Sequence, residues 1–248
     1  MSFKDHFSTQ SAIYRAARPR YAPALFAWLA AQAPGHALAW DAGCGTGQAS
    51  LGLAAHFEHV IATDPSVAQI EQAEPAPNID YRVERAEQST LADASADVVT
   101  VAQALHWFDL DAFHAEVRRV LRPGGIVAEW TYADCHVTPA VDVVKDALYV
   151  DRLDSYWPAE RRLVETGYAS LAFPFARISA PPFELVAQWD LAAFLAYLRS
   201  WSATQRYIKA NGNDPVDELA ADFARAWGDA SEIRAVRWDL AMRVGKNE

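Results

Sequence analysis

In the first half of the chain, short apolar runs alternate with stretches in which hydrophobic residues recur at helical spacing. The apolar runs, which have the composition of buried strands, lie at 37–40, 59–64, 80–84, 97–102 and 126–130. The helical patterns lie between them at 23–32, 47–56 and 110–121. Strands that alternate with helices predict a parallel sheet that carries helices on both faces.

The second half of the chain loses this regular alternation. Residues 133–183 are rich in aromatic residues and arginine, and we expect them to form an insertion that serves as a lid. A strand is expected at 184–189, helices at 191–201 and 216–227, and a last strand at 235–243, which we expect to be the antiparallel edge of a seven-stranded sheet. The pattern predicts one domain whose parts are N-terminal cap helices (1–34), a cofactor-binding core (35–132), the insertion (133–183) and C-terminal strands and helices (184–248).

Composition limits the classes of protein that fit. The 248 residues are 52% hydrophobic, enough for a large core, yet no run approaches the roughly 18 apolar residues of a membrane span. The formal net charge of -10 disfavours nucleic acid and anionic membranes as partners. Two cysteines form no disulfide framework, the seven histidines show no metal-ligand spacing, and the charged N-terminus lacks a signal core. We therefore expect a cytoplasmic protein without a metal site.

A glycine-rich loop follows the first strand. Gly43, Gly45 and Gly47 stand just after Asp41, and a helix is expected to begin there. A dinucleotide fingerprint requires G-x-G-x-x-G, but this chain has its third glycine one place early and Gln48 where that glycine belongs. Asp41 would repel a pyrophosphate and suits a cation instead.

This D-x-G-x-G-x-G pattern resembles motif I of the class I S-adenosylmethionine-dependent methyltransferases. The resemblance implies a Rossmann-like, doubly wound α/β fold with S-adenosylmethionine as cofactor. It implies that the loop holds the methionyl part of the cofactor through Asp41, Gly43, Cys44, Gly45, Thr46 and Gln48. The nearest branch is similar to the trans-aconitate methyltransferases, which act on small molecules.

An acidic residue ends the second strand. Asp64 follows Asp41 by 64 − 41 = 23 positions, close to the offset of about 20 at which a carboxylate meets ribose hydroxyls in nucleotide-binding βαβ units. We expect Asp64 to bind the ribose, with Pro65 and Ser66 beside it. Ser66 and Gln69 have the spacing of a capping box, which predicts a helix that starts after Ser66.

The resemblance also assigns residues that follow the third and fourth strands. Ala86 and Glu87 stand where the family holds the adenine, and Gln103 and Ala104 stand where it meets the methionyl part. His106 follows in a Q-A-x-H-W-F-D run and is the candidate catalytic base. Lining the site is the alternative role for His106, and packing inside the protein is another.

Further candidates are placed on the acceptor side. In the N-terminal segment, Arg18 is a candidate partner for the carboxylate of the cofactor, and Tyr14 is a candidate acceptor contact. We expect an aromatic acceptor pocket made from Trp107, Trp130, Trp157 and Trp201. Arginines that could serve an anionic acceptor stand at positions 15, 18, 161, 162, 177, 199 and 206.

The sequence therefore predicts methyl transfer from S-adenosylmethionine to a small-molecule acceptor, with a carboxylate as one candidate and a phenol or lipophilic acceptor as another. A regulatory protein that binds S-adenosylmethionine or S-adenosylhomocysteine without transferring a methyl group is the alternative. A nicotinamide dehydrogenase is a weaker one. A nucleic-acid methyltransferase is set aside, because residues 103–106 are Q-A-L-H where such enzymes carry a motif such as N-P-P-Y. The sequence indicates no oligomeric state.

Overall fold

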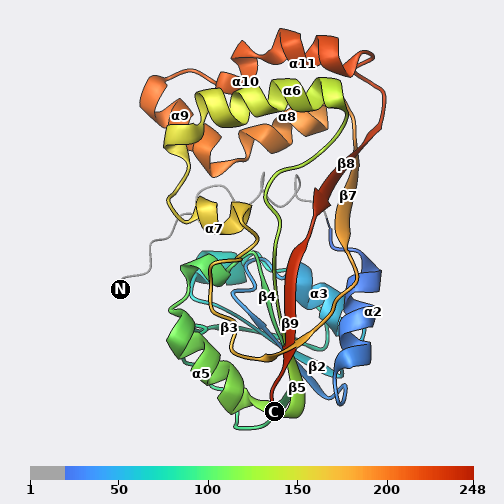
Figure 1. Cartoon of the computed structure of the whole chain (residues 1–248), viewed down its shortest axis with the longest axis vertical. Helices are drawn as coiled ribbons and strands as arrows, with labels where there is room; N and C mark the ends of the chain where they lie inside the picture. The colour runs from blue at the N-terminus through green and yellow to red at the C-terminus, as the bar shows by residue number, and fades with distance from the viewer. Residues whose placement is uncertain (1–19) are drawn as a thin grey trace.

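The computed structural model describes residues 20–248 and has a seven-stranded sheet at its centre, with strand order β3-β2-β1-β4-β5-β9-β6 (Figure 1). Strands β1 to β5 are mutually parallel, β9 is antiparallel to β5, and β6 is antiparallel to β9. The strands are β1 (Leu38–Ala42), β2 (His59–Asp64), β3 (Ile79–Val83), β4 (Ala96–Ala102), β5 (Leu121–Thr131), β6 (Ala176–Ile178) and β9 (Ala241–Lys246). This arrangement confirms the predicted doubly wound, mostly parallel sheet.

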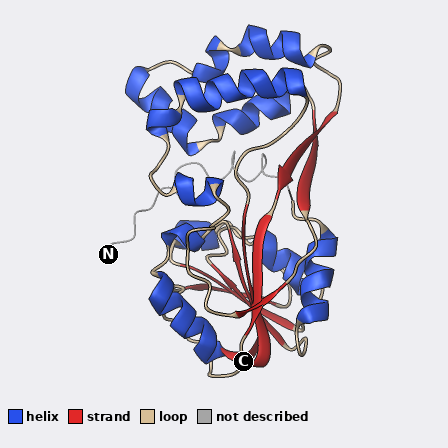
Figure 2. Cartoon of the chain, in the orientation of Figure 1, coloured by secondary structure: helices blue, strands red, loops and turns tan. Residues whose placement is uncertain are grey.

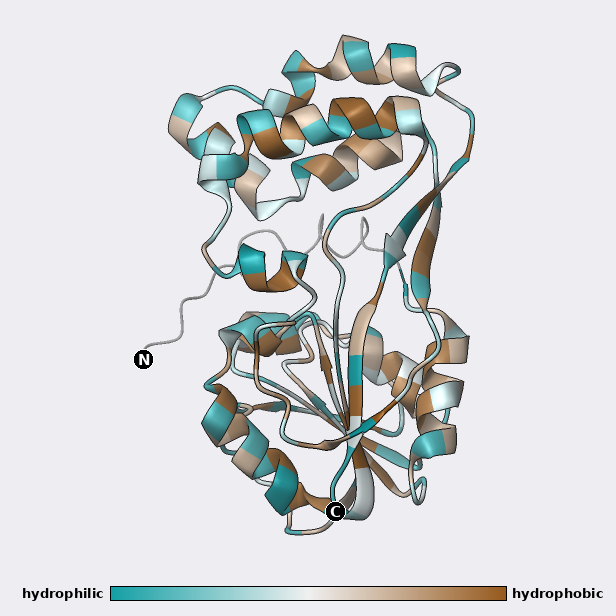
Figure 3. Cartoon of the chain, in the orientation of Figure 1, coloured by the Kyte–Doolittle hydropathy of each residue, from teal (hydrophilic) through white to brown (hydrophobic). Residues whose placement is uncertain are grey.

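Helices cover both faces of the sheet (Figure 2). On one face, the apolar sides of α2 (Pro23–Gln32) and α3 (Gln48–Ala54) pack on strand residues such as Val60 and Val98. On the other face, α5 (Leu110–Val120) packs on a cluster around Trp40. Hydrophobic and hydrophilic residues alternate along α5 in Figure 3, as expected for a helix with one buried face. The ends of these three helices lie within two residues of the predicted ends.

The predicted C-terminal strand at 235–243 is in fact two strands in different sheets. Strand β8 (Arg234–Asp239) pairs with β7 (Glu184–Trp189) in a separate two-stranded ribbon, and β9 enters the central sheet. Leu240 is the single residue between the two strands, and its amide donates to the carbonyl of Phe183. The antiparallel strand is also not the edge of the sheet as expected, because the short strand β6 pairs outside it.

A helical layer stands above the carboxyl edge of the sheet (Figure 1). Residues 133–183 were expected to form the lid by themselves. The layer also includes residues 191–227, whereas β6, within 133–183, pairs with β9 in the sheet. The two segments form one layer because they share a hydrophobic core, in which Phe194 packs on Phe223 and Trp227 at centroid distances of 5.9 and 5.5 Å. Its helices are α6 (Pro139–Asp146), a π-helical turn (Ala147–Arg152), α8 (Leu191–Arg199), α9 (Ser202–Asn211), α10 (Pro215–Glu218) and α11 (Ala220–Trp227). Helix α7 (Arg161–Glu165) lies between this layer and the sheet (Figure 1), and its Val164 packs in the core cluster around Trp40. Within residues 20–248, no helix is long and apolar enough to cross a membrane.

A buried ionic cluster joins the sheet to the loop that precedes β6. Glu129 on β5 is fully buried, and its carboxylate lies 2.5 Å from Arg243 Nη2 on β9 and 2.8 Å from His114 Nε2 on α5. Arg243 also donates to the carbonyls of Tyr168 at 3.0 Å and Leu171 at 2.7 Å. One guanidinium therefore fixes a loop more than 70 residues away in sequence.

We expect Arg243→Met to lower the free energy of unfolding by about 3 to 5 kcal/mol, because it leaves the Glu129 charge buried without its partner. Urea unfolding followed by tryptophan fluorescence measures this change. Arg237→Met is the matched control: it removes an arginine of the same type from a pair with Glu184 in which both side chains are about half exposed. Arg237→Met should lower the free energy of unfolding by less than about 1 kcal/mol. If both variants lost the same free energy of unfolding, burial of the Glu129–Arg243 pair would not be what makes its loss costly.

Candidate active site

The glycine loop connects β1 to α3 at the carboxyl edge of the sheet. Gly43 has φ +69°, and a Cβ there would lie 2.6 Å from the Cβ of Ala104, so only glycine allows the loop to pass so close to the end of β4. Gly45 has φ +56°, and the nearest atom to a Cβ there would be Gln69 Oε1 at 3.9 Å. The middle of the loop therefore borders open space, as a cofactor cradle requires.

Asp64 closes this loop from the neighbouring strand. Its Oδ2 accepts a hydrogen bond from the Gly45 amide at 3.0 Å, and its Oδ1 accepts one from the Ser66 amide at 2.9 Å. The carboxylate therefore lies at the border of the open space beside Gly45. Ser66 caps the amide of Gln69 as predicted, but only half of the capping box forms, because Asp64 takes the Ser66 amide that Gln69 was expected to bind.

Asp41 lies beneath the loop and is fully buried. Its carboxylate accepts hydrogen bonds from Ser50 Oγ at 2.6 Å and Thr100 Oγ1 at 2.9 Å, which join β1 to α3 and β4. Burial raises its pKa to about 6, although these hydroxyls oppose the shift. Both oxygens are thus used inside the protein, and a direct contact between Asp41 and the cofactor stays a prediction.

The remaining loop positions are partly engaged within the protein. The amides of Gly43 and Cys44 donate to the carbonyl of Thr63 at 2.8 and 3.0 Å, so a cofactor carboxylate would have to displace these bonds to use them. Burial raises the pKa of the Cys44 thiol, with the charges of Asp41 and Asp64 adding to the effect, so the thiol is neutral. Thr46, Gln48 and Pro65 are half-buried around the same opening, and their contacts with the cofactor stay predictions.

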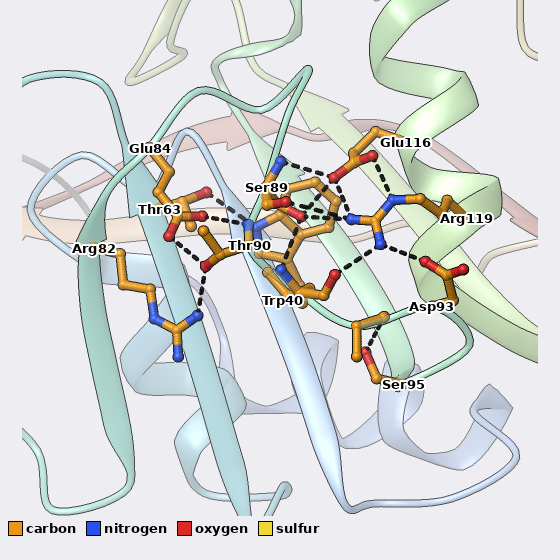
Figure 4. A network of polar contacts seen from close by, with 12 residues as sticks. Trp40, Thr63, Arg82, Glu84, Ser89, Thr90, Asp93, Ser95, Glu116 and Arg119 are labelled. Atoms are coloured by element: carbon orange, nitrogen blue, oxygen red, sulfur yellow. Dashed lines mark hydrogen bonds and ion pairs between the residues drawn. The ribbon is translucent and has the colours of Figure 1, made fainter.

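The loop after β3 is fixed against α5 by a polar network (Figure 4). Glu116 accepts from the amide and hydroxyl of Ser89, both at 2.7 Å, and from Arg119 at 2.6 Å. Burial would raise the pKa of Glu116, but the hydrogen bonds from Arg119 and Ser89 outweigh it and lower the pKa to about 2. This loop carries the predicted adenine contacts, so the network holds that part of the candidate site in place.

Within that loop, Ala86 is buried and Glu87 is bound inside the protein. Glu87 Oε1 accepts from the Asp109 amide at 3.0 Å, and Oε2 accepts from Arg85 Nε at 3.2 Å. Glu87 therefore joins the β3 loop to the start of α5. Its contact with the adenine stays a prediction.

A second group of polar side chains meets at the ends of β4 and β5. Gln103 has φ +58°, and its side-chain amide bridges the two strands: Nε2 donates to the Tyr132 carbonyl at 2.6 Å, and Oε1 accepts from Thr131 Oγ1 at 2.5 Å. His106 lies in a short 3-10 turn (Leu105–Trp107), and its Nδ1 is 2.9 Å from Tyr168 Oη. Sequence reasoning missed Thr131 and Tyr168, because no motif marks either residue.

The four tryptophans predicted to form one acceptor pocket are not brought together. Trp157 and Trp201 do meet, at a centroid distance of 5.6 Å, in the core of the helical layer. Trp107 is 37% exposed beside His106 at the end of β4. Trp130 is fully buried in the core on the α2 side, where it packs on Tyr21 at 5.6 Å, because its place on β5 turns it to that face. The four-tryptophan pocket is therefore wrong as predicted. Tyr14 and Arg18 lie outside the described residues.

Comparison with known proteins places this site in a family. A family profile described as a methyltransferase domain matches residues 40–128. A Dictyostelium discoideum protein named as a candidate methyltransferase is 33% identical over 254 residues, which span 99% of this chain and 96% of the relative. The chain belongs to the class I S-adenosylmethionine-dependent methyltransferases. Its cofactor is S-adenosylmethionine, and the open space at Gly45 beside the Asp64 carboxylate suits this group.

Solved structures agree with this assignment. The structure of a candidate type II methyltransferase from Anaeromyxobacter dehalogenans matches with a TM-score of 0.89 and 49% identity, over 93% of this chain and 98% of that one. A candidate methyltransferase from Anabaena variabilis, at 18% identity and a TM-score of 0.54, shares the fold. In the part of the chain that the structure describes, no group of side chains could hold a metal ion.

If Asp64 binds the ribose, Asp64→Asn should weaken S-adenosylhomocysteine binding by about 1.5 to 3 kcal/mol, the range for hydrogen bonds to a charged group. Titration calorimetry with S-adenosylmethionine, S-adenosylhomocysteine and NAD measures it, and NAD should not bind. Asp80→Asn, which changes an exposed carboxylate on the next strand, is the control and should leave affinity unchanged. Unchanged affinity in a folded Asp64→Asn protein would remove the ribose assignment.

The raised pKa of Asp41 predicts a pH-dependent loss of stability. Between its ordinary pKa of 3.8 and the folded value of about 6, the folded protein keeps a proton that the unfolded chain has lost. Stability therefore falls as pH rises through this window, by about 2 to 3 kcal/mol between pH 4 and 7. The side chain of the Asp41→Asn variant cannot ionise. Between pH 4 and 7, the free energy of unfolding of the wild type should therefore fall by this amount relative to that of the variant, as measured by urea unfolding without cofactor. If the difference in unfolding free energy between wild type and variant did not change with pH, the pKa of Asp41 would not be raised by burial.

Proposed function

We propose that this methyltransferase transfers the methyl group to an oxygen of a small-molecule acceptor that carries a carboxylate, in the manner of the trans-aconitate-like branch. The observation that supports this proposal is the placement of Arg161, a cation at the carboxyl edge of the sheet between the core and the helical layer. The first form of the proposal is methylation of the carboxylate itself. Such an acceptor is already ionised at neutral pH and needs a cationic partner rather than a base.

The structure separates Arg161 from the other candidate arginines that it describes. Arg199 is held by Asp214 and Asp217 at 2.7 and 2.5 Å. Arg177 lies on β6 beside Gly245, toward the opposite end of β5 from the candidate site. Arg162 is exposed. Arg206, from α9, donates to the carbonyl of Tyr156.

Arg161 is preorganised by its neighbours. Its Nη2 donates to the carbonyl of Ala133, two residues past β5, at 2.8 Å, and its Nε donates to Tyr149 Oη at 2.7 Å. The guanidinium stacks 4.7 Å from the ring centroid of Trp157, and the side chain is 17% exposed. Glu165 lies 3.8 Å away and offsets part of the charge. A guanidinium fixed in this way can bind a planar carboxylate at small entropic cost.

The reaction needs placement more than acid–base chemistry. When bound, S-adenosylmethionine supplies an electrophilic methyl group on a sulfonium. The glycine loop and Asp64 would orient the cofactor. Arg161 and the aromatic side chains of Tyr149 and Trp157 would hold the acceptor. Bringing acceptor oxygen and methyl carbon into line can contribute about 7 to 11 kcal/mol.

The name of one relative supports methylation of an oxygen, and a contact in the site supports a second form of the proposal. A Dechloromonas aromatica protein named malonyl-[acyl-carrier protein] O-methyltransferase is 38% identical over 99 residues, 39% of this chain and 36% of that protein. The hydrogen bond between His106 and Tyr168 favours instead a hydroxyl acceptor, whose proton must be removed. Both forms are oxygen methylation of a small carboxylate-bearing molecule.

A screen of small carboxylates and hydroxylated carboxylates with labelled S-adenosylmethionine tests the proposal. A methyl ester is cleaved by alkali and a methyl ether is not, so alkaline release of label identifies the oxygen. Arg161→Gln should raise KM for the acceptor about 10- to 100-fold, the equivalent of a charge-assisted hydrogen bond. Arg162→Gln, the exposed neighbour, should leave KM unchanged. Equal KM values for both variants, or transfer only to acceptors without a carboxylate, would contradict the role of Arg161.

A further inference from the structure

The short helix α4 (Val67–Ile70), which follows Asp64 at the carboxyl edge of the sheet, has an inverted pattern of burial. Its apolar Val67 is 55% exposed, whereas its polar Gln69 is 8% exposed. Among the residues of α4, all of which the structure describes, Gln69 alone is buried. Glutamine is seldom buried unless the polar atoms of its side chain are hydrogen-bonded, so the burial of Gln69 requires an explanation.

The side-chain amide of Gln69 has no hydrogen-bond partner among residues 20–248, although its backbone is bonded normally. The backbone amide of Gln69 donates to Ser66 Oγ at 3.4 Å. In a complete capping box, the side chain of Gln69 would bind the amide of Ser66. That amide donates instead to Asp64 Oδ1 at 2.9 Å. The side chain of Gln69 is therefore left without the partner that its place in the sequence predicts.

This unpartnered amide faces the open space in the glycine loop. Gln69 Oε1 is the atom nearest to the position that a Cβ on Gly45 would take, at a distance of 3.9 Å. The Gly45 amide donates to Asp64 Oδ2 at 3.0 Å, so the Asp64 carboxylate borders the same space. Acceptor oxygens of Asp64 and Gln69 thus lie on either side of Gly45. A buried amide without a hydrogen bond destabilises a protein, and such a cost is typical of sites that a ligand completes.

We propose that Gln69 is a cofactor-binding residue whose Oε1 accepts a hydrogen bond from a ribose hydroxyl of S-adenosylmethionine, beside Asp64. A hydroxyl fits because it has a proton to donate, and the oxygens of Asp64 and Gln69 that border the space only accept. The α-ammonium group of the cofactor is the other donor, and the analogues used below separate the two. The inference rests on the expected binding of the ribose by Asp64 and does not depend on which molecule accepts the methyl group.

Titration calorimetry with S-adenosylhomocysteine tests this contact without any acceptor. Gln69→Met keeps the length of the side chain and removes its hydrogen-bonding atoms. It should lower the affinity about 3- to 10-fold, the equivalent of one hydrogen bond between uncharged groups. Gln69→Asn, which withdraws the amide from the open space, should show the same loss and serves if Gln69→Met fails to fold.

Gln188→Met is the matched control, because Gln188 is an exposed glutamine on β7, in the two-stranded ribbon. This variant should bind S-adenosylhomocysteine as tightly as the wild type does. If the Gln69 variants also kept the affinity of the wild type, the proposal would be overturned.

Analogues of S-adenosylhomocysteine that lack the 2′ or the 3′ hydroxyl identify the group that Gln69 binds. With one of these analogues, wild type and Gln69→Met should bind equally, because the hydroxyl that Gln69 contacts is missing. If Gln69→Met bound both analogues more weakly than the wild type does, the partner would be another donor, such as the ammonium group, and the ribose assignment of Gln69 would be wrong.

Urea unfolding separates a binding role from a structural one. Without cofactor, the free energy of unfolding of Gln69→Met should equal or exceed that of the wild type, because the variant lacks a buried polar group that has no partner. At the same concentration of S-adenosylhomocysteine, the variant should be stabilised less than the wild type, since stabilisation by a ligand follows its affinity. Equal losses of stability with and without the ligand would show that Gln69 supports the fold and would overturn the proposal.

Discussion

The ion pair between Glu129 and Arg243 connects the parts of this protein that are most distant in sequence. The two residues are 114 positions apart, and neither side chain reaches solvent to any large extent. Removing two charges from water is costly, and the pair is favourable only because its remaining donors and acceptors are also satisfied. Here Arg243 binds three carbonyls of residues 168–172, and Glu129 also contacts His114. The pair thereby joins β5, β9, α5 and the loop that carries Tyr168.

The two halves of the active site are stabilised in different ways. The cofactor side is built from residues close together in the chain, where Asp64 closes the glycine loop of the preceding βα unit through one backbone hydrogen bond. The proposed acceptor side is built from segments that meet only in the folded protein, such as Arg161, which donates to the Ala133 carbonyl just past β5. The helical layer supplies the aromatic wall around Arg161, so the acceptor side depends on the packing of that layer on its own core.

This difference explains what could be predicted from the sequence. The sheet and the glycine loop are encoded in short, local patterns, and the spacing of Asp64 follows from the βαβ unit itself. The splitting of residues 235–243 could not be seen, because both strands have a suitable pattern and only the partner strand decides which sheet each one joins. Trp130 was misplaced for a similar reason, since the last seven residues of β5 are all buried and the strand gives no alternation that would show which face each side chain takes. Tyr168 binds His106 across 62 residues, a distance over which no sequence pattern operates.

Unusual backbone conformations occur beside His106. In residues 20–248, three residues other than glycine have positive φ: Ala94, Gln103 and Tyr168. Two of these three lie beside His106: Gln103 precedes it by three residues, and Tyr168 Oη is 2.9 Å from its Nδ1. Such conformations cost about 1 to 3 kcal/mol each and persist only where the surroundings hold them. Gln103 is held by bonds from its own amide to Trp130 and from its side chain to Tyr132, and Tyr168 is held by Arg243. A relaxed backbone at either residue would turn its side chain away from its present partner, which is Thr131 for Gln103 and His106 for Tyr168.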